Sequence, residues 1–191
     1  LSPGPLPIFV LGLPRSGKTT VERLLSSDPD IYAAGETRFL ISALAADQPV
    51  GDVLSRYSAP QPDQFLRAGD AYMAQVRELA GTARCIVDTM PGNFRYVGLI
   101  KLILPGAKIV HCTRDPLDHC LAIYQKYFPR DTHEYSYNLE ELADYYREYR
   151  KLMDHWDKVL PGYVHHVSFD RLVAGDEDEM KALLNFTGAD I

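Results

Sequence analysis

The stretch that decides the fold is Ile8-Phe9-Val10-Leu11-Gly12-Leu13-Pro14-Arg15-Ser16-Gly17-Lys18-Thr19-Thr20. Its first four residues form a continuous apolar run, which is typical of a strand buried inside a parallel sheet. The next eight match the phosphate-loop pattern G-x-x-x-x-G-K-[ST], and apolar residues at helical spacing follow at Val21, Leu24 and Leu25. A strand, a glycine-containing loop and a helix in this order predict a site for a phosphate-like anion.

The chemistry of this loop follows from its glycines. Without side chains, they let successive backbone N–H groups turn toward one anion, and the following helix contributes the positive end of its dipole. Lys18 and the hydroxyl groups of Ser16, Thr19 and Thr20 can add to this cradle around Gly17. A glycine turn that only joins a strand to a helix is the alternative, and the flanking patterns favour phosphate binding.

The rest of the chain alternates short apolar runs with helical patterns. Strands are predicted at 84–88, 108–113 and 163–169, and helices at 96–104, 117–128, 139–158 and 180–186. Residues 40–80 are predicted to form helical pieces separated by Pro49, Pro60 and Pro62, and residues 1–7, with three prolines, to lie outside helix and sheet. The alternation predicts one α/β domain over 1–191, with a central parallel sheet flanked by helices, as in P-loop-containing nucleoside triphosphate hydrolases.

Composition excludes several classes of function. Twenty Lys and Arg against 26 Asp and Glu give a formal charge of −6, which argues against broad charge-driven binding of nucleic acid. The apolar run at 8–13 is far shorter than the roughly 20 residues of a membrane span, and it lacks the flanks of a signal peptide. Cys85, Cys112 and Cys120 have no metal-ligand spacing, so we expect buried thiols in a reducing, cytoplasmic setting.

Two enzyme classes fit the phosphate loop. One is a Mg·ATP-dependent small-molecule kinase, in which Thr19 would contact Mg²⁺ and Asp88, at the end of a predicted strand, would supply a second acidic group. An aspartate at the end of an apolar strand is common for structural reasons, so Asp88 alone is weak evidence for a kinase.

The other class comes from the residues around the loop. The segment 13–19 resembles the 5′-phosphosulfate loop of sulfotransferases, whose usual form is P-[RK]-S-G-T-T. Further similar segments are Asp28-Pro29-Asp30, Gly35-Glu36-Thr37-Arg38, Asp88-Thr89-Met90-Pro91-Gly92-Asn93-Phe94-Arg95-Tyr96 and Cys112-Thr113-Arg114-Asp115-Pro116-Leu117-Asp118. They are similar to tyrosylprotein sulfotransferases and to bacterial sulfotransferases often fused to tetratricopeptide repeats. The resemblance covers residues 7–188, favours the sulfotransferase form of the P-loop fold, and allows for a tetratricopeptide-repeat region in the full-length protein.

This resemblance implies transfer of a sulfuryl group from 3′-phosphoadenosine-5′-phosphosulfate (PAPS) to a hydroxyl or amine, with no metal required. Arg15 would lie beside the sulfonate and the leaving oxygen, Glu36 would be the general base, and Arg114 would bind the 3′-phosphate. Relatives usually carry threonine at Lys18 and lysine at Thr89. Our hypothesis is that Lys18 supplies, from the other side of the site, the catalytic charge that Thr89 lacks.

Two further departures from the family concern nucleotide binding. The usual serine eight residues after Arg114 is Ala122 here, and Lys126, on the same predicted helix column as Asp118, either replaces that hydroxyl or is a solvated lysine. Relatives also continue beyond Gly188 into a basic segment that closes over the nucleotide. A fragment, or a weakly active or inactive nucleotide-binding module, is therefore a third interpretation.

The acceptor is left open between small molecules, sugars, lipids and peptides, and residues 37–83 are expected to shape its pocket. Tyrosines between 135 and 149 are expected to pack in the core. His165 and His166 are expected to point to opposite faces of a strand, and core roles are expected for His111 and His119, so no metal site is predicted.

Overall fold

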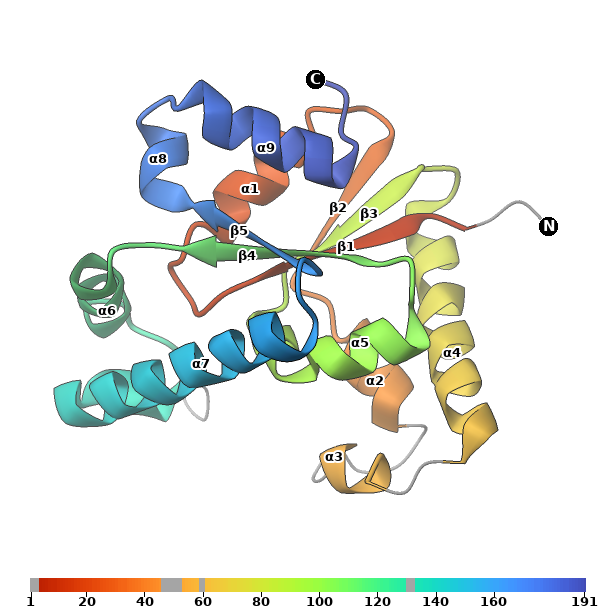
Figure 1. The fold of residues 1–191 in the computed structure, drawn as a ribbon, viewed down its shortest axis with the longest axis horizontal. Coiled ribbons are helices and arrows are strands. Elements are labelled where there is room, and N and C mark those ends of the chain that lie inside the picture. Colours follow the sequence, from red (N-terminus) through yellow and green to blue (C-terminus); the bar gives the residue numbers. More distant parts are fainter. Residues whose placement is uncertain (1–3, 46–52, 59–60, 130–132) are drawn as a thin grey trace.

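A five-stranded parallel sheet organises the computed structural model, which describes residues 4–45, 53–58, 61–129 and 133–191. The strands are β1 (Leu6–Leu11), β2 (Ile31–Gly35), β3 (Cys85–Asp88), β4 (Lys108–Thr113) and β5 (Val164–Ser168). Their order is β2-β3-β1-β4-β5, and every neighbouring pair is parallel (Figure 1). The predicted α/β fold with a central parallel sheet is confirmed.

Helices cover both faces of the sheet (Figure 1). One face carries α1 (Lys18–Leu25), α8 (Phe169–Val173) and α9 (Glu177–Thr187). The other carries α2 (Phe39–Ala45), α4 (Pro62–Ala80), α5 (Val97–Ile103) and α7 (Leu139–Val159). The remaining helical elements are α3 (Val53–Arg56), α6 (Pro116–Tyr124) and the short 3-10 helices η2 (Pro91–Tyr96) and η3 (Glu134–Tyr137).

The core lies on both sides of β1, the central strand. Its side chains alternate, with Phe9 and Leu11 in the cluster under α2, α4, α5 and α7, and Ile8 and Val10 in the cluster under α1 and α9. All four are fully buried, and the Phe9 ring packs 5.5 Å from that of Tyr72. Burying an apolar side chain of this size contributes about 1.5–3 kcal/mol, so this strand fixes the phosphate loop that follows it.

Two parts of the sheet differ from the prediction. Strand β2 was not predicted, because it lies at a sheet edge and exposes Tyr32 and Ala33, so it has no continuous apolar run. Pro7 was placed outside the sheet, yet β1 begins at Leu6. The Leu6 N–H donates to the Arg84 carbonyl, on the β3 side of β1. The backbone nitrogen of Pro7 therefore faces β4, and the pairing of β1 with β4 starts only at Ile8. The missing N–H of Pro7 therefore removes no ladder hydrogen bond.

The predicted helices are found with shifted ends. The 139–158 helix is α7, and its N-cap Asn138 accepts hydrogen bonds from the backbone N–H groups of Glu140 and Glu141. The helix predicted over 180–186 begins earlier, at Glu177, and the one predicted over 117–128 already ends at Tyr124. The predicted helical pieces over 40–80 are α2, α3 and α4, and α4 begins at Pro62. Pro49 and Pro60 lie outside the described residues.

The cysteines and paired histidines lie largely as predicted. Cys85 and Cys112 are buried free thiols, whereas Cys120 is half-buried. Cys112 belongs to the buried cluster under α1 and α9, and burial raises the pKa of its thiol to about 12. The His165 ring stacks on Phe186 of α9, whereas the His166 ring packs against His111 on the other face of the sheet. The two rings therefore point apart, as predicted.

Within residues 4–45, 53–58, 61–129 and 133–191, no group of three His, Cys, Asp or Glu side chains is placed to hold a metal ion. None of the helices there is long and apolar enough to cross a membrane.

Candidate functional site

The carboxyl ends of the parallel strands border a cavity of about 330 Å³, here called the loop cavity. Open parallel sheets commonly bind ligands at this edge. The lining residues are Pro14, Arg15, Gly17, Lys18, Thr19, Thr20, Glu36, Arg114, Phe128 and Phe169. Seven of the nine residues proposed from the sequence therefore meet in one cavity, and the other two, Ser16 and Lys126, do not line it.

The backbone of the phosphate loop requires glycine at two positions. Gly12 and Gly17 have φ values of 147° and 98°, which favour glycine. A Cβ at Gly12 would lie 2.4 Å from Ser16 Oγ, and a Cβ at Gly17 would lie 2.3 Å from Phe169 Cδ2. Arg15 has a φ of 68°, an uncommon value for a residue with a side chain. Such strain costs about 1–3 kcal/mol and clusters at functional sites.

The start of α1 supplies the anion-binding groups. The Gly17 carbonyl accepts hydrogen bonds from the backbone N–H groups of Thr20 (2.9 Å) and Val21 (3.2 Å), which closes the first turn. The N–H groups of Lys18 and Thr19, at the first positions of the helix, have no intrahelical acceptor. These donors, with the positive end of the helix dipole, can bind a phosphate or sulfate group.

Lys18 lies beneath the loop rather than on the surface. Its side chain is almost fully buried, and its Nζ donates to the Leu13 carbonyl over 3.3 Å. Burial lowers the pKa of Lys18, and the Glu36 carboxylate opposes this effect. The Lys18 amine therefore interacts both with the loop backbone, through the Leu13 carbonyl, and with the Glu36 carboxylate.

Ser16 contributes differently from the prediction. Its side chain is completely buried beneath Gly12, and its hydroxyl has no hydrogen-bond partner in the described residues. Its backbone N–H donates to the Leu13 carbonyl over 3.3 Å. Ser16 is thus placed to shape the loop from within, while the hydroxyl-bearing residues that line the loop cavity are Thr19 and Thr20.

Arg114 reaches the loop cavity from the end of β4. Its guanidinium carbon lies 5.3 Å from the centre of the Phe169 ring, and its Nε lies 3.8 Å from Asp170 Oδ1. Nε is buried and has no hydrogen-bond acceptor among the described residues. The ring and the carboxylate hold the guanidinium in place while leaving donors for a ligand.

Two aromatic residues of the loop cavity were not identified from the sequence. Phe169 contacts both Gly17 and Arg114, and Phe128 lines the cavity as well. Phe169 begins α8, whose N-cap Ser168 accepts a hydrogen bond from the Arg171 N–H. For Phe169, an aromatic residue at the end of a predicted strand was the available signal, and it is too common to identify a site.

His119 supports the phosphate loop from below. Its Nε2 lies 2.9 Å from the Pro14 carbonyl oxygen, so the ring donates to the loop backbone. Burial, with smaller effects from Arg114 and Lys18, lowers the pKa of His119 to about 4. The core roles predicted for His119 and His111 are confirmed, because both are almost fully buried.

The low pKa of His119 predicts loss of stability in acid. Because the folded pKa lies below the usual 6.5, the neutral ring stabilises the fold fully above pH 6.5, and this contribution is lost as the pH falls toward 4. The loss is at most about 1.4 kcal/mol per pH unit. We expect the unfolding free energies of the wild type and His119→Gln to differ more at pH 7.5 than at pH 5 in urea titrations. A constant difference would contradict the assignment.

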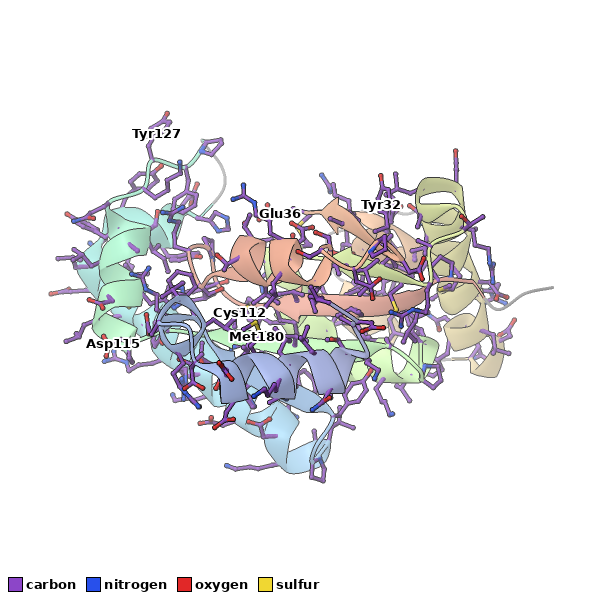
Figure 2. The ribbon with its side chains drawn as sticks, turned by 90° about the horizontal axis from the view of Figure 1, so that it is seen from above. Tyr32, Glu36, Cys112, Asp115, Tyr127 and Met180 are labelled. Carbon is purple, nitrogen blue, oxygen red and sulfur yellow. The ribbon has the colours of Figure 1, made fainter. Side chains whose placement is uncertain are left out.

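Glu36 is positioned by hydrogen bonds at the end of β2. The Gly35 N–H donates to Glu22 Oε1 (2.7 Å), and the Gly35 carbonyl accepts from the Thr89 N–H (2.9 Å). The Thr37 hydroxyl donates to Asp88 over 2.7 Å. These bonds fix the backbone on both sides of Glu36, whose own side chain is exposed beside the loop cavity (Figure 2).

Asp88 holds strand ends together and does not line the loop cavity. Its completely buried carboxylate accepts hydrogen bonds from Thr37, Tyr72 and Asn93 and from the backbone of Met90. Burial raises its pKa to about 6. Both oxygens are therefore engaged by the protein itself, unlike a carboxylate that faces a nucleotide-bound metal.

Lys126 does not lie on the helix column that the sequence predicted for it. Because α6 ends at Tyr124, Lys126 lies beyond the helix and does not continue the column through Asp118 and Ala122. Its side chain is exposed outside the loop cavity.

A second cavity of about 720 Å³ lies on the other side of Glu36, and we call it the tyrosine cavity. It is lined by Leu13, Pro14, Glu36, Met90, Pro91, Gly92, Phe94, Arg95, His133, Glu134, Tyr135, Glu141 and Tyr145. Tyr146 and Tyr149 pack in the core as expected, but Tyr135 and Tyr145 form a wall of this cavity. Apart from Glu36, its lining comes from the phosphate loop, from α7, and from η2 and η3 with the residue before each of them; none of the described residues within 37–83 lines it.

Two curated proteins are similar to this chain over almost its whole length. At 32% identity over 194 residues, an Aquifex aeolicus (strain VF5) protein of unassigned function matches 96% of this chain and 26% of its own length. A Caenorhabditis briggsae protein, provisionally named a protein-tyrosine sulfotransferase, is 24% identical over 94% of this chain and 64% of its own. The chain thus spans about a quarter of the length of the Aquifex aeolicus protein and somewhat under two thirds of the length of the Caenorhabditis briggsae protein.

The solved structures share the fold. The sulfotransferase domain of the Synechococcus PCC 7002 olefin synthase superposes with a TM-score of 0.64 at 19% identity, covering 98% of this chain and 75% of that one. The family model described as "Sulfotransferase family" matches residues 7–191, almost the whole sequence. The chain therefore belongs to the sulfotransferase family.

Proposed function

We propose that this chain transfers a sulfuryl group from PAPS to a hydroxyl or amine acceptor. The observation that carries the proposal is the loop cavity, which brings a helix N-terminus, two separate arginines and one carboxylate together. PAPS carries anionic groups at its 5′ and 3′ ends. A site with a backbone cradle at one end and Arg114 at the other fits both ends of such a molecule.

The charged and hydroxyl-bearing residues that line the loop cavity have separate roles in this proposal. The start of α1, with Lys18, Thr19 and Thr20, binds the 5′-phosphosulfate end, and Arg114 binds the 3′-phosphate. Arg15 stabilises negative charge that develops on the sulfonate and the leaving oxygen, because a guanidinium stays charged and presents fixed donors. Glu36 accepts the proton of the acceptor as the new bond to sulfur forms.

The kinase alternative has less support from the geometry. The loop matches the full G-x-x-x-x-G-K-[ST] pattern. Asp88, the acidic residue that a kinase would need near the metal, is completely buried and does not line the loop cavity. Thr37 and Asn93 occupy its oxygens.

Ligand-induced stabilisation separates the candidate functions. A ligand that binds only the folded state raises the melting temperature by mass action, about 2.7 kcal/mol of stabilisation at 100 times its Kd. We expect 3′,5′-ADP to raise the melting temperature equally with and without Mg²⁺, and ATP to do so much less. Differential scanning fluorimetry measures both.

Three results would change the conclusion. Stabilisation by ATP that depends on Mg²⁺, without an effect of 3′,5′-ADP, would establish the kinase alternative. Stabilisation by 3′,5′-ADP without sulfate transfer from PAPS to any of a panel of phenols, sugars and amines would indicate a nucleotide-binding module. No stabilisation by either nucleotide would contradict the proposed donor site.

A further inference from the structure

We propose that the tyrosine cavity binds the acceptor and that this acceptor carries a protonated amine on a flat, apolar frame in addition to the group that is sulfated. The inference rests on the proposed function, because it takes Glu36 as the base. It adds the chemical class of the acceptor, which the sequence leaves open.

The position of the cavity makes it the acceptor side. Glu36 and Pro14 line both the loop cavity and the tyrosine cavity, so they form the boundary between the two. A molecule in the tyrosine cavity can therefore present a hydroxyl group to Glu36 while the donor occupies the loop cavity on the other side. In-line transfer needs this arrangement, with acceptor and leaving group on opposite sides of the transferring group.

The charges of the tyrosine cavity favour a cation. Besides Glu36, it contains the carboxylates of Glu134 and Glu141, which are exposed and take part in no ion pair within the described ranges. Among the described residues that line it, Arg95 has the one guanidinium, and Nη2 of that residue donates to the Tyr145 hydroxyl over 2.6 Å. The described lining therefore presents more negative than positive charge to an occupant.

His133 does not offset this negative charge. Burial lowers the pKa of the imidazole below its usual value, so the ring is neutral at pH 7. The Tyr135 hydroxyl lies 3.3 Å from its Nδ1. Burial raises the pKa of Tyr135, so this phenol stays neutral as well.

The aromatic wall supplies the second property of the acceptor. The rings of Tyr135 and Tyr145 stack in parallel with their centres 3.8 Å apart, and Phe94, Met90 and Pro91 add apolar surface. Such a rigid wall suits a flat hydrocarbon frame, and aromatic faces also attract an ammonium group. Aromatic surface together with unpaired carboxylates distinguishes an amine-bearing acceptor from an acidic or a purely apolar one.

The transfer step balances without a further reactant. The acceptor oxygen forms a bond to sulfur as its proton passes to the Glu36 carboxylate. The bond from sulfur to the bridging oxygen of PAPS breaks, and 3′,5′-ADP leaves with that electron pair. The amine of the acceptor stays protonated beside Glu134 and Glu141 and takes no part in bond making.

Three phenols that differ chiefly in the charge of the side chain test the proposal. Calorimetry would compare the binding of tyramine, 4-ethylphenol and 3-(4-hydroxyphenyl)propionate at low salt, with and without saturating 3′,5′-ADP. We expect tyramine to bind about tenfold more tightly than 4-ethylphenol, and the propionate to bind most weakly.

Two neighbouring residues give a matched pair of variants. Glu140 and Glu141 both lie in the first turn of α7 and both donate their N–H to Asn138, but only Glu141 lines the tyrosine cavity. Glu141→Gln is expected to reduce the preference for tyramine at least threefold, on the scale of one exposed ion pair, and Glu140→Gln to leave it unchanged. The affinity for 3′,5′-ADP should be the same in both variants.

The outcomes separate this proposal from the proposed function. If 3′,5′-ADP stabilises the wild type but the three phenols bind equally, the propionate binds best, or none binds at 10 mM, the acceptor class is wrong and the donor site stands. An equal loss of preference in both glutamine variants would also overturn it, since it would indicate a general charge effect. If 3′,5′-ADP fails to bind, the proposed function fails, and the titrations without nucleotide still decide whether the cavity prefers a cation.

Discussion

Replacing Glu36 with glutamine is expected to lower the turnover number for sulfate transfer by about 10²–10⁴-fold, the usual contribution of a general base. The amide keeps the size of the side chain but cannot accept the acceptor's proton. Because Glu36 is exposed and the backbone around it is held by Glu22, Thr89 and Asp88, the fold should not change. A radiolabelled PAPS transfer assay measures the rate, and fluorimetry with 3′,5′-ADP checks that the donor site is intact.

A matched carboxylate shows whether a loss of turnover is specific to Glu36. Glu78→Gln removes an exposed carboxylate from α4, away from both cavities, and should behave as the wild type. Turnover of Glu36→Gln within twofold of the wild type would remove Glu36 from the catalytic role.

Replacing Arg114 with alanine is expected to weaken the binding of 3′,5′-ADP about 100-fold while changing the affinity for 5′-AMP less than threefold. A buried charge-assisted contact of this kind is worth about 2–5 kcal/mol, and only the first nucleotide has a 3′-phosphate to lose it. Calorimetric titration of both nucleotides measures the difference.

The control for this prediction is another arginine. Arg23 is exposed near the end of α1 and does not line the loop cavity, so Arg23→Ala should leave both affinities unchanged. If Arg114→Ala weakens the two nucleotides to the same extent, Arg114 does not recognise the 3′-phosphate, and its ion pair with Asp170 has a structural role instead.

Short-range patterns carried the parts of the fold that the sequence predicted. The apolar runs that form β1, β3, β4 and β5 are long enough to be recognised in the sequence, and Asn138 marks the start of α7. The phosphate loop was recognised because its donors are neighbours in sequence. The edge strand β2 could not be predicted, because its pairing with β3 depends on backbone groups. Its exposed residues Tyr32 and Ala33 interrupt the apolar run by which a buried strand is recognised.

Long-range contacts account for what the sequence did not predict. The support of Pro14 by His119 and the burial of Asp88 under Thr37 join residues far apart in the chain. The tyrosine cavity likewise combines η2, η3 and α7, so spacing within one helix could not show which residues of the other elements Tyr145 would meet. The roles of the site residues in donor binding and catalysis stay predictions, which the variants above test.

The ring of Phe169 touches both ends of the proposed donor site, since it lies against Gly17 and beneath Arg114. The phosphate loop is consequently not a portable module. Grafting residues 12–20 onto another α/β scaffold would carry over the backbone cradle but lose its partner, which comes from the opposite end of the chain. Protein engineers who wish to transplant this recognition would have to move the β5–α8 junction together with the loop.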